Sequence, residues 1–148
     1  GITWNTYQSF CKTKGTVARR ADLKALTDVE VLAVYVELFV NPLRLMEIEN
    51  DWKREAMFSA AMNHGGVNGV RLAQGAVSTG IKVDGVLGSR TLEAINNTAA
   101  TAFVNNLAVE SSLFVARYVK RRVHKGDVSQ VYNLVGWLTR YLRFIRPR

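Results

Sequence analysis

The sequence predicts a mainly α-helical protein, and three observations lead to this fold class. Helix-start signals precede several segments, apolar residues recur at three- and four-residue spacing, and strand-like alternation is weak throughout. The chain has 148 residues, 48% of them hydrophobic, which suffices to bury a core. Because it contains two prolines and no Ser/Gly/Pro-rich linker, we predict a single compact domain over residues 1–148.

Each predicted helix has its own start or stop signal. Thr3 can cap the first, and a capping box at residues 27–30 opens the second, which Asn41-Pro42 ends. Gly80 is predicted to end the fourth in the left-handed conformation, and Ser89 to cap the fifth. The predicted helices cover about residues 4–15, 27–40, 52–62, 67–79, 90–97, 99–123 and 131–145.

Positive charge is concentrated at the C-terminal end of the chain. Residues 1–116 carry 11 Lys/Arg against 11 Asp/Glu, whereas residues 117–148 carry nine Lys/Arg against Asp127 alone. A basic face of this kind attracts polyanions such as nucleic acid, anionic lipid or the polymers of a bacterial wall. A solvated helix face that only aids solubility is an equally good interpretation.

Several function classes lack their sequence signals. Cys11 is the only cysteine and is accompanied by two histidines, His64 and His124, so we predict no disulfide and no metal site. A small buried hydrophobic role for Cys11 is favoured over a nucleophile. We find no nucleotide-binding loop, no serine-hydrolase elbow, no DNA-reading motif and no apolar run long enough to span a membrane. We therefore expect no cofactor, no specific nucleic acid and no membrane span.

Four segments, in this order, resemble glycoside hydrolase family 108. They are residues 1–3 (Gly-Ile-Thr), 58–65, 84–92 and 136–140. The family comprises bacterial and prophage N-acetylmuramidases, some called secretion activators, with a lysozyme-like helical catalytic region followed by a peptidoglycan-binding part. The resemblance implies a lysozyme-like fold in which residues 1–65 are part of the catalytic region and residues 66–148 form the peptidoglycan-binding part, with no linker between them.

The resemblance also implies candidate site residues. Those expected to line a substrate cleft are Gly1, Ile2, Thr3, Asn63 and Trp137, and those of a wall-binding segment are Asp84, Gly85, Gly88 and Thr91. For two of them a structural role is equally open, because Asn63 could simply end a helix and Trp137 could belong to the core. The wall-binding pattern, Asp84-Gly-x-x-Gly-x-x-Thr91, also occurs in other wall-binding helical modules.

The family's general acid is a glutamate that precedes the Gly-Ile-Thr segment, so we expect the catalytic acid to lie before Gly1. Glycoside hydrolysis usually needs two carboxyl groups. Within the chain Glu47, Glu49 and Asp51 cluster, and Glu37 interrupts an apolar helix, but we interpret all four as solvent-exposed.

The implied activity is hydrolysis of the β-1,4 bond between N-acetylmuramic acid and N-acetylglucosamine, without a cofactor. Its partner would be peptidoglycan and its place of action the periplasm or cell wall. The alternative is a non-catalytic peptidoglycan-binding or secretion-assisting module. A nucleic-acid binder has only the C-terminal charge in its favour.

Overall fold

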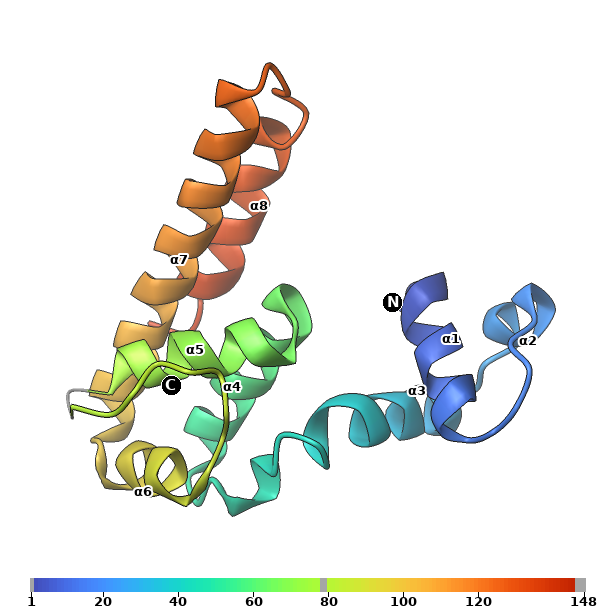
Figure 1. Ribbon diagram of the computed structural model, residues 1–148, viewed down its shortest axis with the longest axis horizontal. Helices are drawn as coiled ribbons and strands as arrows, with labels where there is room; N and C mark the ends of the chain where they lie inside the picture. The colour runs from blue at the N-terminus through green and yellow to red at the C-terminus, as the bar shows by residue number, and fades with distance from the viewer. Residues whose placement is uncertain (1, 78–79, 146–148) are drawn as a thin grey trace. The chain divides into compact units, whose positions relative to one another are not determined.

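The computed structural model describes residues 2–77 and 80–145, and within them the chain is helical with no strand (Figure 1). This confirms the predicted fold class. The α-helices are α1 (Trp4–Thr13), α2 (Arg20–Lys24), α3 (Asp28–Tyr35), α4 (Asp51–His64), α5 (Gly66–Ala76), α6 (Ser89–Asn97), α7 (Ala100–His124) and α8 (Val131–Leu142). A π-helical turn, Val36–Val40, follows α3, and a 3-10 turn covers Leu45–Glu47.

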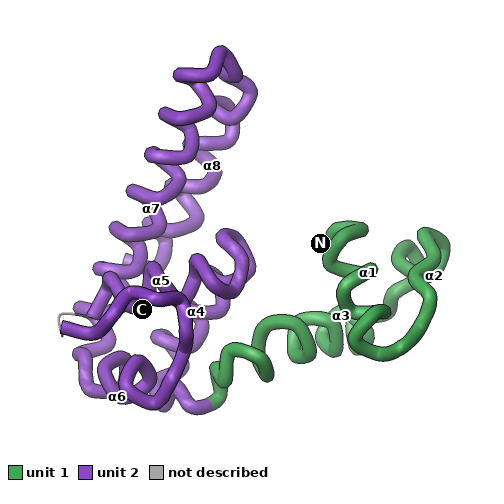
Figure 2. The backbone as a smooth tube through the Cα atoms, in the orientation of Figure 1, with its two compact units in different colours: residues 1–46 green, residues 47–148 purple. Residues whose placement is uncertain are grey.

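The chain divides into two compact units, Gly1–Met46 and Glu47–Arg148 (Figure 2). This boundary differs in place from the expected division into residues 1–65 and 66–148. Whether the two units form a single domain stays a prediction.

Unit 1 contains α1, α2 and α3. The Thr3 hydroxyl accepts a hydrogen bond from the Thr6 N–H at 3.2 Å, and the capping box of Thr27 and Glu30 opens α3, so both predicted start signals are confirmed. Cys11 is buried, in agreement with its interpretation as a small hydrophobic residue. An ion pair of 2.8 Å joins Lys14, after α1, to Glu37 in the π-helical turn.

Unit 2 is built on the antiparallel pair α4 and α5, against which the long helix α7 packs (Figure 1). Helix α8 turns back along α7 and forms a helical hairpin with it. The large side chains that are completely buried in this unit come from α4, α5, α6, α7 and the segment before α4: Ile48, Met57, Val70, Ile95, Phe103 and Val104. The apolar periodicity of the sequence thus forms a core shared by most helices of the unit.

Helices α4 and α5 cross in close contact because glycine occupies the crossing point. A Cβ atom added to Gly69 would lie 2.7 Å from the Ala61 Cα atom and 2.8 Å from its nitrogen. The turn between the helices depends on Gly65, whose φ of 81° is one that other residues rarely adopt. These two glycines allow the tight helical pair on which the rest of unit 2 packs.

The first turn of α4 and the segment before it are both fixed to the end of α6. Buried Lys53 donates through Nζ to the carbonyl oxygens of Ile95 at 2.7 Å and Asn96 at 2.9 Å, which are among the last of α6. A cation at this position satisfies free carbonyls and complements the helix dipole. The Asn96 side chain accepts from the Glu49 N–H and donates to the Glu47 carbonyl. Burial lowers the pKa of Lys53 below its usual value.

Three predicted boundaries are wrong in detail. Helix α5 ends at Ala76, where Val77 is extended and Asn106 donates to the Ala76 carbonyl at 3.0 Å, so Gly80 does not end it and has no positive φ. The rest of the predicted end, residues 78–79, lies outside the described residues. Gly88 precedes α6 as its N-cap, which makes Ser89 the first helical residue. The last helix ends at Leu142 and not near residue 145.

None of the described helices is by itself long and apolar enough to cross a membrane. Taken together, α6 and α7 have a suitable length and composition, but the pair bends by 116°. Buried residues of both helices belong to the core of unit 2.

We predict that Gly69→Ala destabilises the protein by about 1–3 kcal/mol, because the new methyl group meets backbone atoms of Ala61 that must move. The matched control is Gly75→Ala in the same helix, whose added Cβ would meet the flexible Glu110 side chain at 3.5 Å. That control should be neutral or stabilising by about 0.5–1 kcal/mol, since alanine is the better helix former. Urea unfolding of both variants measures the difference, and equal stabilities would contradict the close crossing.

Candidate functional site

A groove of about 340 Å³ runs between the turn from α4 to α5 and the hairpin of α7 and α8. All the elements that form it belong to unit 2. It is lined by Asn63, His64, Asn68, Phe114, Val115, Tyr118, Gln130, Trp137 and Tyr141. Four of these residues are Phe, Tyr or Trp, and three are Asn or Gln, which carry side-chain amides. This combination, apolar faces with a few polar groups, is typical of small-molecule and sugar sites.

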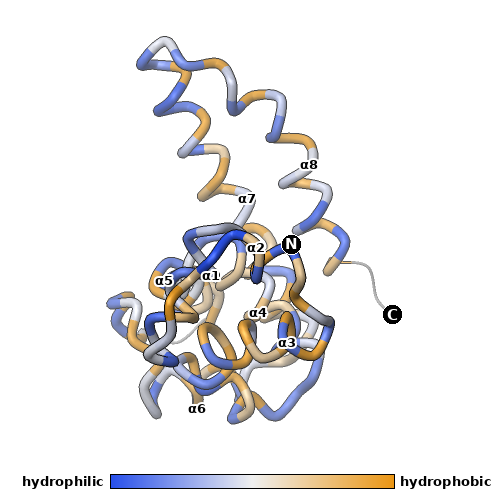
Figure 3. Tube along the Cα trace, turned by 90° about the vertical axis from the view of Figure 1, so that its right-hand side faces the viewer, coloured by the Kyte–Doolittle hydropathy of each residue, from blue (hydrophilic) through white to orange (hydrophobic). Residues whose placement is uncertain are grey.

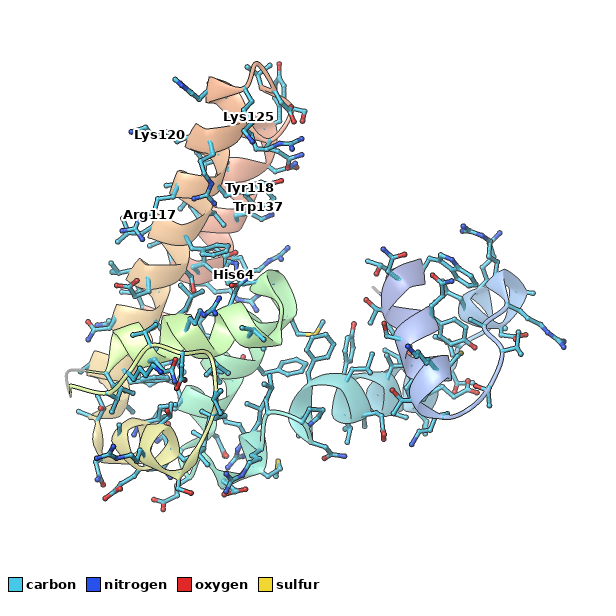
Figure 4. All side chains as sticks on the ribbon, in the orientation of Figure 1. His64, Arg117, Tyr118, Lys120, Lys125 and Trp137 are labelled. Carbon is cyan, nitrogen blue, oxygen red and sulfur yellow. The ribbon has the colours of Figure 1, made fainter. Side chains whose placement is uncertain are left out.

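His64 ends α4 and lies at the foot of the hairpin, with Tyr118 and Trp137 further along it (Figure 4). Its ring meets those of Phe114 and Tyr141, with centroid distances of 4.9 and 5.2 Å. Burial lowers the pKa of His64 to about 4, so the imidazole is neutral at pH 7. Its Nε2 atom is buried and has no hydrogen-bond partner among the described residues.

Asn63 is held in place by its own helix, α4, and by α8. Its amide nitrogen donates to the Ser59 carbonyl at 2.7 Å, and its amide oxygen accepts a hydrogen bond from Arg140 of α8. The contact with Arg140 connects the end of α4 to the hairpin beside the groove. Asn63 therefore lies at a helix end and also lines the groove, so the two interpretations offered by the sequence do not exclude each other.

Trp137 is half-buried and lies edge-on to Tyr118, with ring centroids 6.2 Å apart and planes at 65°. It packs against the cluster of Ala108, Val115 and Tyr141 and also lines the groove. One ring thus contributes to the core and offers apolar surface to a ligand. An edge-on aromatic pair of this kind also stabilises the hairpin.

The segment of the Asp-Gly-x-x-Gly-x-x-Thr pattern is folded around buried Gln74 of α5. The Gln74 amide nitrogen donates to Asp84 Oδ1 at 2.9 Å and to Thr91 Oγ1 at 3.2 Å, and its amide oxygen accepts from the Gly85 N–H at 2.9 Å. The hydrogen bond from Gln74, followed by that from the Val86 N–H, holds the pKa of Asp84 below its usual value. The polar groups of Asp84 and Thr91 are thus occupied in closing the loop.

Gly85 of the same segment is required by its backbone. Its φ is 84°, and an added Cβ would lie 2.8 Å from Val67 Cγ1. Gly88 is the N-cap of α6 and has open space around it. Sequence reasoning missed Gln74, although a glutamine among the apolar residues of a predicted helix face is a signal that could have identified it.

A wider hollow of about 730 Å³ lies over this segment, lined by Gly80, Ile81, Lys82, Asp84, Val86, Gly88, Ser89, Arg90 and Thr91. Its cationic side chains are Lys82 and Arg90, both exposed. The role of the segment in wall binding stays a prediction, and these two cations, absent from the sequence-based set, are the side chains best able to meet an anionic partner.

The carboxylates that the sequence offers as candidate acids are not among the described residues that line the groove. Glu37 pairs with Lys14 in unit 1, and Asp51 pairs with Arg54 at 2.6 Å in the first turn of α4. Glu47 and Glu49 belong to the segment whose backbone binds Asn96. The groove therefore offers a binding surface without an acid of its own.

The remaining predicted cleft residues lie in unit 1. Thr3 is the N-cap of α1, Ile2 is half-buried, and Gly1 lies outside the described residues. Asn63 and Trp137 are the two predicted cleft residues that the structure brings together, and the sharing of one cleft by all five stays a prediction.

No family model and no curated protein matches the sequence. A solved structure does: that of Brucella abortus SagA, with a TM-score of 0.69 and 24% sequence identity. The match covers 99% of this chain and 79% of the SagA chain. At this level of identity the similarity shows a shared fold.

We predict that His64 makes the stability of the protein depend on pH between about 6.5 and 4. The unfolded chain binds a proton at His64 below about pH 6.5, whereas the folded state resists protonation until about pH 4. Stability is therefore complete above pH 6.5 and falls as the pH is lowered, by at most about 3 kcal/mol.

Thermal melts across this range should show a shallower decline for His64→Gln than for the parent. His124→Gln removes an exposed histidine and serves as the control. If the pH profiles of all three proteins were parallel, His64 would not be the group responsible.

Proposed function

We propose that the chain is part of a lysozyme-type peptidoglycan hydrolase, an N-acetylmuramidase that cleaves the β-1,4 bond between N-acetylmuramic acid and N-acetylglucosamine. In this proposal the groove beside His64 binds the glycan. The observation that carries it is the meeting of Asn63 and Trp137, which the family resemblance names together, in one groove with aromatic walls.

The composition of the groove supports a sugar ligand. Trp137 and Tyr118 offer ring faces or edges to the apolar side of a pyranose, and Asn68 and Gln130 offer amide donors and acceptors to its hydroxyl and acetamido groups. Neutral His64 adds a polar atom without a charge, which suits an uncharged sugar. Arg140 lies beside the groove and could meet the carboxylate of a muramic acid substituent.

The helical fold that this chain shares with Brucella abortus SagA agrees with the mainly helical fold that the family resemblance implies. The general acid in this proposal is the glutamate that the family has before its Gly-Ile-Thr segment. It would protonate the leaving oxygen as positive charge develops on the sugar. We further propose the periplasm or cell wall as the place of action and peptidoglycan as the partner.

The absence of a carboxylate among the described residues of the groove favours a second candidate, a non-catalytic peptidoglycan-binding module. It uses the same groove and the same ligand but makes no cut. The two candidates agree on binding and differ in whether new reducing ends appear.

The full-length encoded protein, incubated with purified peptidoglycan, should lower its turbidity and release new reducing ends. Reductive labelling of the products identifies which sugar carries the new end, and N-acetylmuramic acid at that end supports a muramidase. Binding to insoluble peptidoglycan without new ends would support the non-catalytic module. A protein that neither binds nor cuts would contradict both.

Replacing the groove tryptophan should weaken this binding. We expect Trp137→Ala to reduce the affinity for insoluble peptidoglycan about tenfold, since a stacked aromatic ring contributes on the order of 1 kcal/mol or more. Arg140→Ala tests the same groove without disturbing the core, because the Arg140 side chain is exposed. The matched control is Tyr132→Ala, which removes an exposed aromatic ring of α8 outside the groove. Equal affinities of all variants, with unchanged melting temperatures, would exclude the groove as the glycan site.

A further inference from the structure

Helix α8 carries more apolar surface than the core of unit 2 uses. Eight of its 12 residues are aliphatic or aromatic. One face packs inward: Tyr141 is buried with α7, and Leu134, Trp137 and Leu138 pack against the same cluster. The opposite side of α8 is mixed, because exposed Gly136, Thr139 and Arg140 lie there together with exposed apolar side chains.

Beside the inward face, α8 carries an apolar stripe that is open to solvent. We call Val131, Tyr132, Val135 and Leu142 the outer stripe. Tyr132 is 87% exposed and Val135 is 73% exposed. The residues Tyr132, Val135 and Leu142 are spaced by three and seven positions, which places them on one side of a helix. Hydrophobic residues recur along the whole of α8 in Figure 3. Single exposed apolar residues are ordinary, but a continuous stripe marks a contact surface.

The charges around the outer stripe are positive. No Asp or Glu occurs after Asp127, and Asp127 itself is paired with Arg122 of α7. Arg143 follows the end of α8 and is exposed, and Lys125 lies at the turn of the hairpin (Figure 4). The helix combines an apolar stripe with cations at both ends and carries no acid. This combination favours one kind of anionic partner over the others. A nucleic acid or an anionic wall polymer would use the cations and leave Tyr132 and Val135 in water, whereas an anionic bilayer uses both.

We propose that the outer stripe of α8 binds the surface of an anionic phospholipid bilayer. The helix lies parallel to the membrane plane, with Tyr132 and Val135 in the boundary between head groups and acyl chains. Lys125 and Arg143 meet lipid phosphates at the two ends. A helix of 12 residues is about 18 Å long, so it lies on the membrane and does not cross it. This contact is separate from the glycan groove, which the inner face of the same helix lines.

Sedimentation with lipid vesicles tests the proposal. The protein should bind vesicles of phosphatidylcholine mixed with phosphatidylglycerol, bind pure phosphatidylcholine much more weakly, and lose affinity as salt is added. The double variant Tyr132→Ser/Val135→Ser should reduce binding to the mixed vesicles about tenfold or more, because it removes most of the apolar surface that enters the lipid. Lys125→Gln/Arg143→Gln should reduce the preference for anionic lipid.

The matched control is Val17→Ser/Val29→Ser, which removes two side chains of unit 1 that are 79% and 77% exposed. It should bind vesicles as the parent does. Because the vesicles contain no peptidoglycan, failure here leaves the proposed function standing. Peptidoglycan binding measured on the same variants should be unchanged by Tyr132→Ser/Val135→Ser.

Three results would overturn the proposal. The first is no binding of the parent protein to anionic vesicles at low salt. The second is equal binding by the stripe variant and the parent. The third is a concentration-dependent dimer of the parent that the stripe variant abolishes, without vesicle binding by either, since the occupant of the stripe would then be a second copy of the chain.

Discussion

The close crossing of α4 and α5 at Gly69 and Ala61 is the contact on which unit 2 depends. No side chain separates the two backbones there, so the helices lie close together, and α7 packs against both of them. The same crossing directs the turn at Gly65 toward the hairpin. The groove forms where the α7–α8 hairpin packs beside the turn that joins the closely spaced helices α4 and α5.

Polar groups buried in unit 2 are mostly satisfied by partners distant in sequence, and these partners give the irregular segments their shape. Lys53 satisfies the last carbonyls of α6, and Gln74 organises the loop that leads into that helix. An unpaired buried amide or ammonium group would cost more than its hydrogen bonds contribute, so each must form together with the loop it supports. The residues of the Asp84 to Thr91 pattern thus hold the loop before α6 in its folded conformation through their hydrogen bonds with Gln74.

Helix α8 connects the proposed glycan groove with the proposed lipid contact, because each of the two sites uses a different face of this helix. Its inner face contributes Trp137 and Tyr141 to the groove and to the core, and its outer face contributes the stripe. A protein that binds a glycan on one side of a helix and a lipid surface on the other would hold its groove close to the membrane. Substitutions at Trp137 and Tyr132 separate these two roles, since the two rings lie on different faces of α8.

The sequence by itself determined the helical class and the features that depend on neighbours a few residues apart. Thr3 and the Thr27–Glu30 box open helices through hydrogen bonds that span three residues, so their pattern was sufficient to predict them. Tertiary structure alone decided that Ala76 ends α5, because Asn106, 30 residues later, takes its carbonyl. It also decided that Arg140 meets Asn63 and that His64 is desolvated between two rings from α7 and α8. Such contacts depend on how helices pack, and packing depends on side chains brought together from the whole unit, which no local spacing encodes.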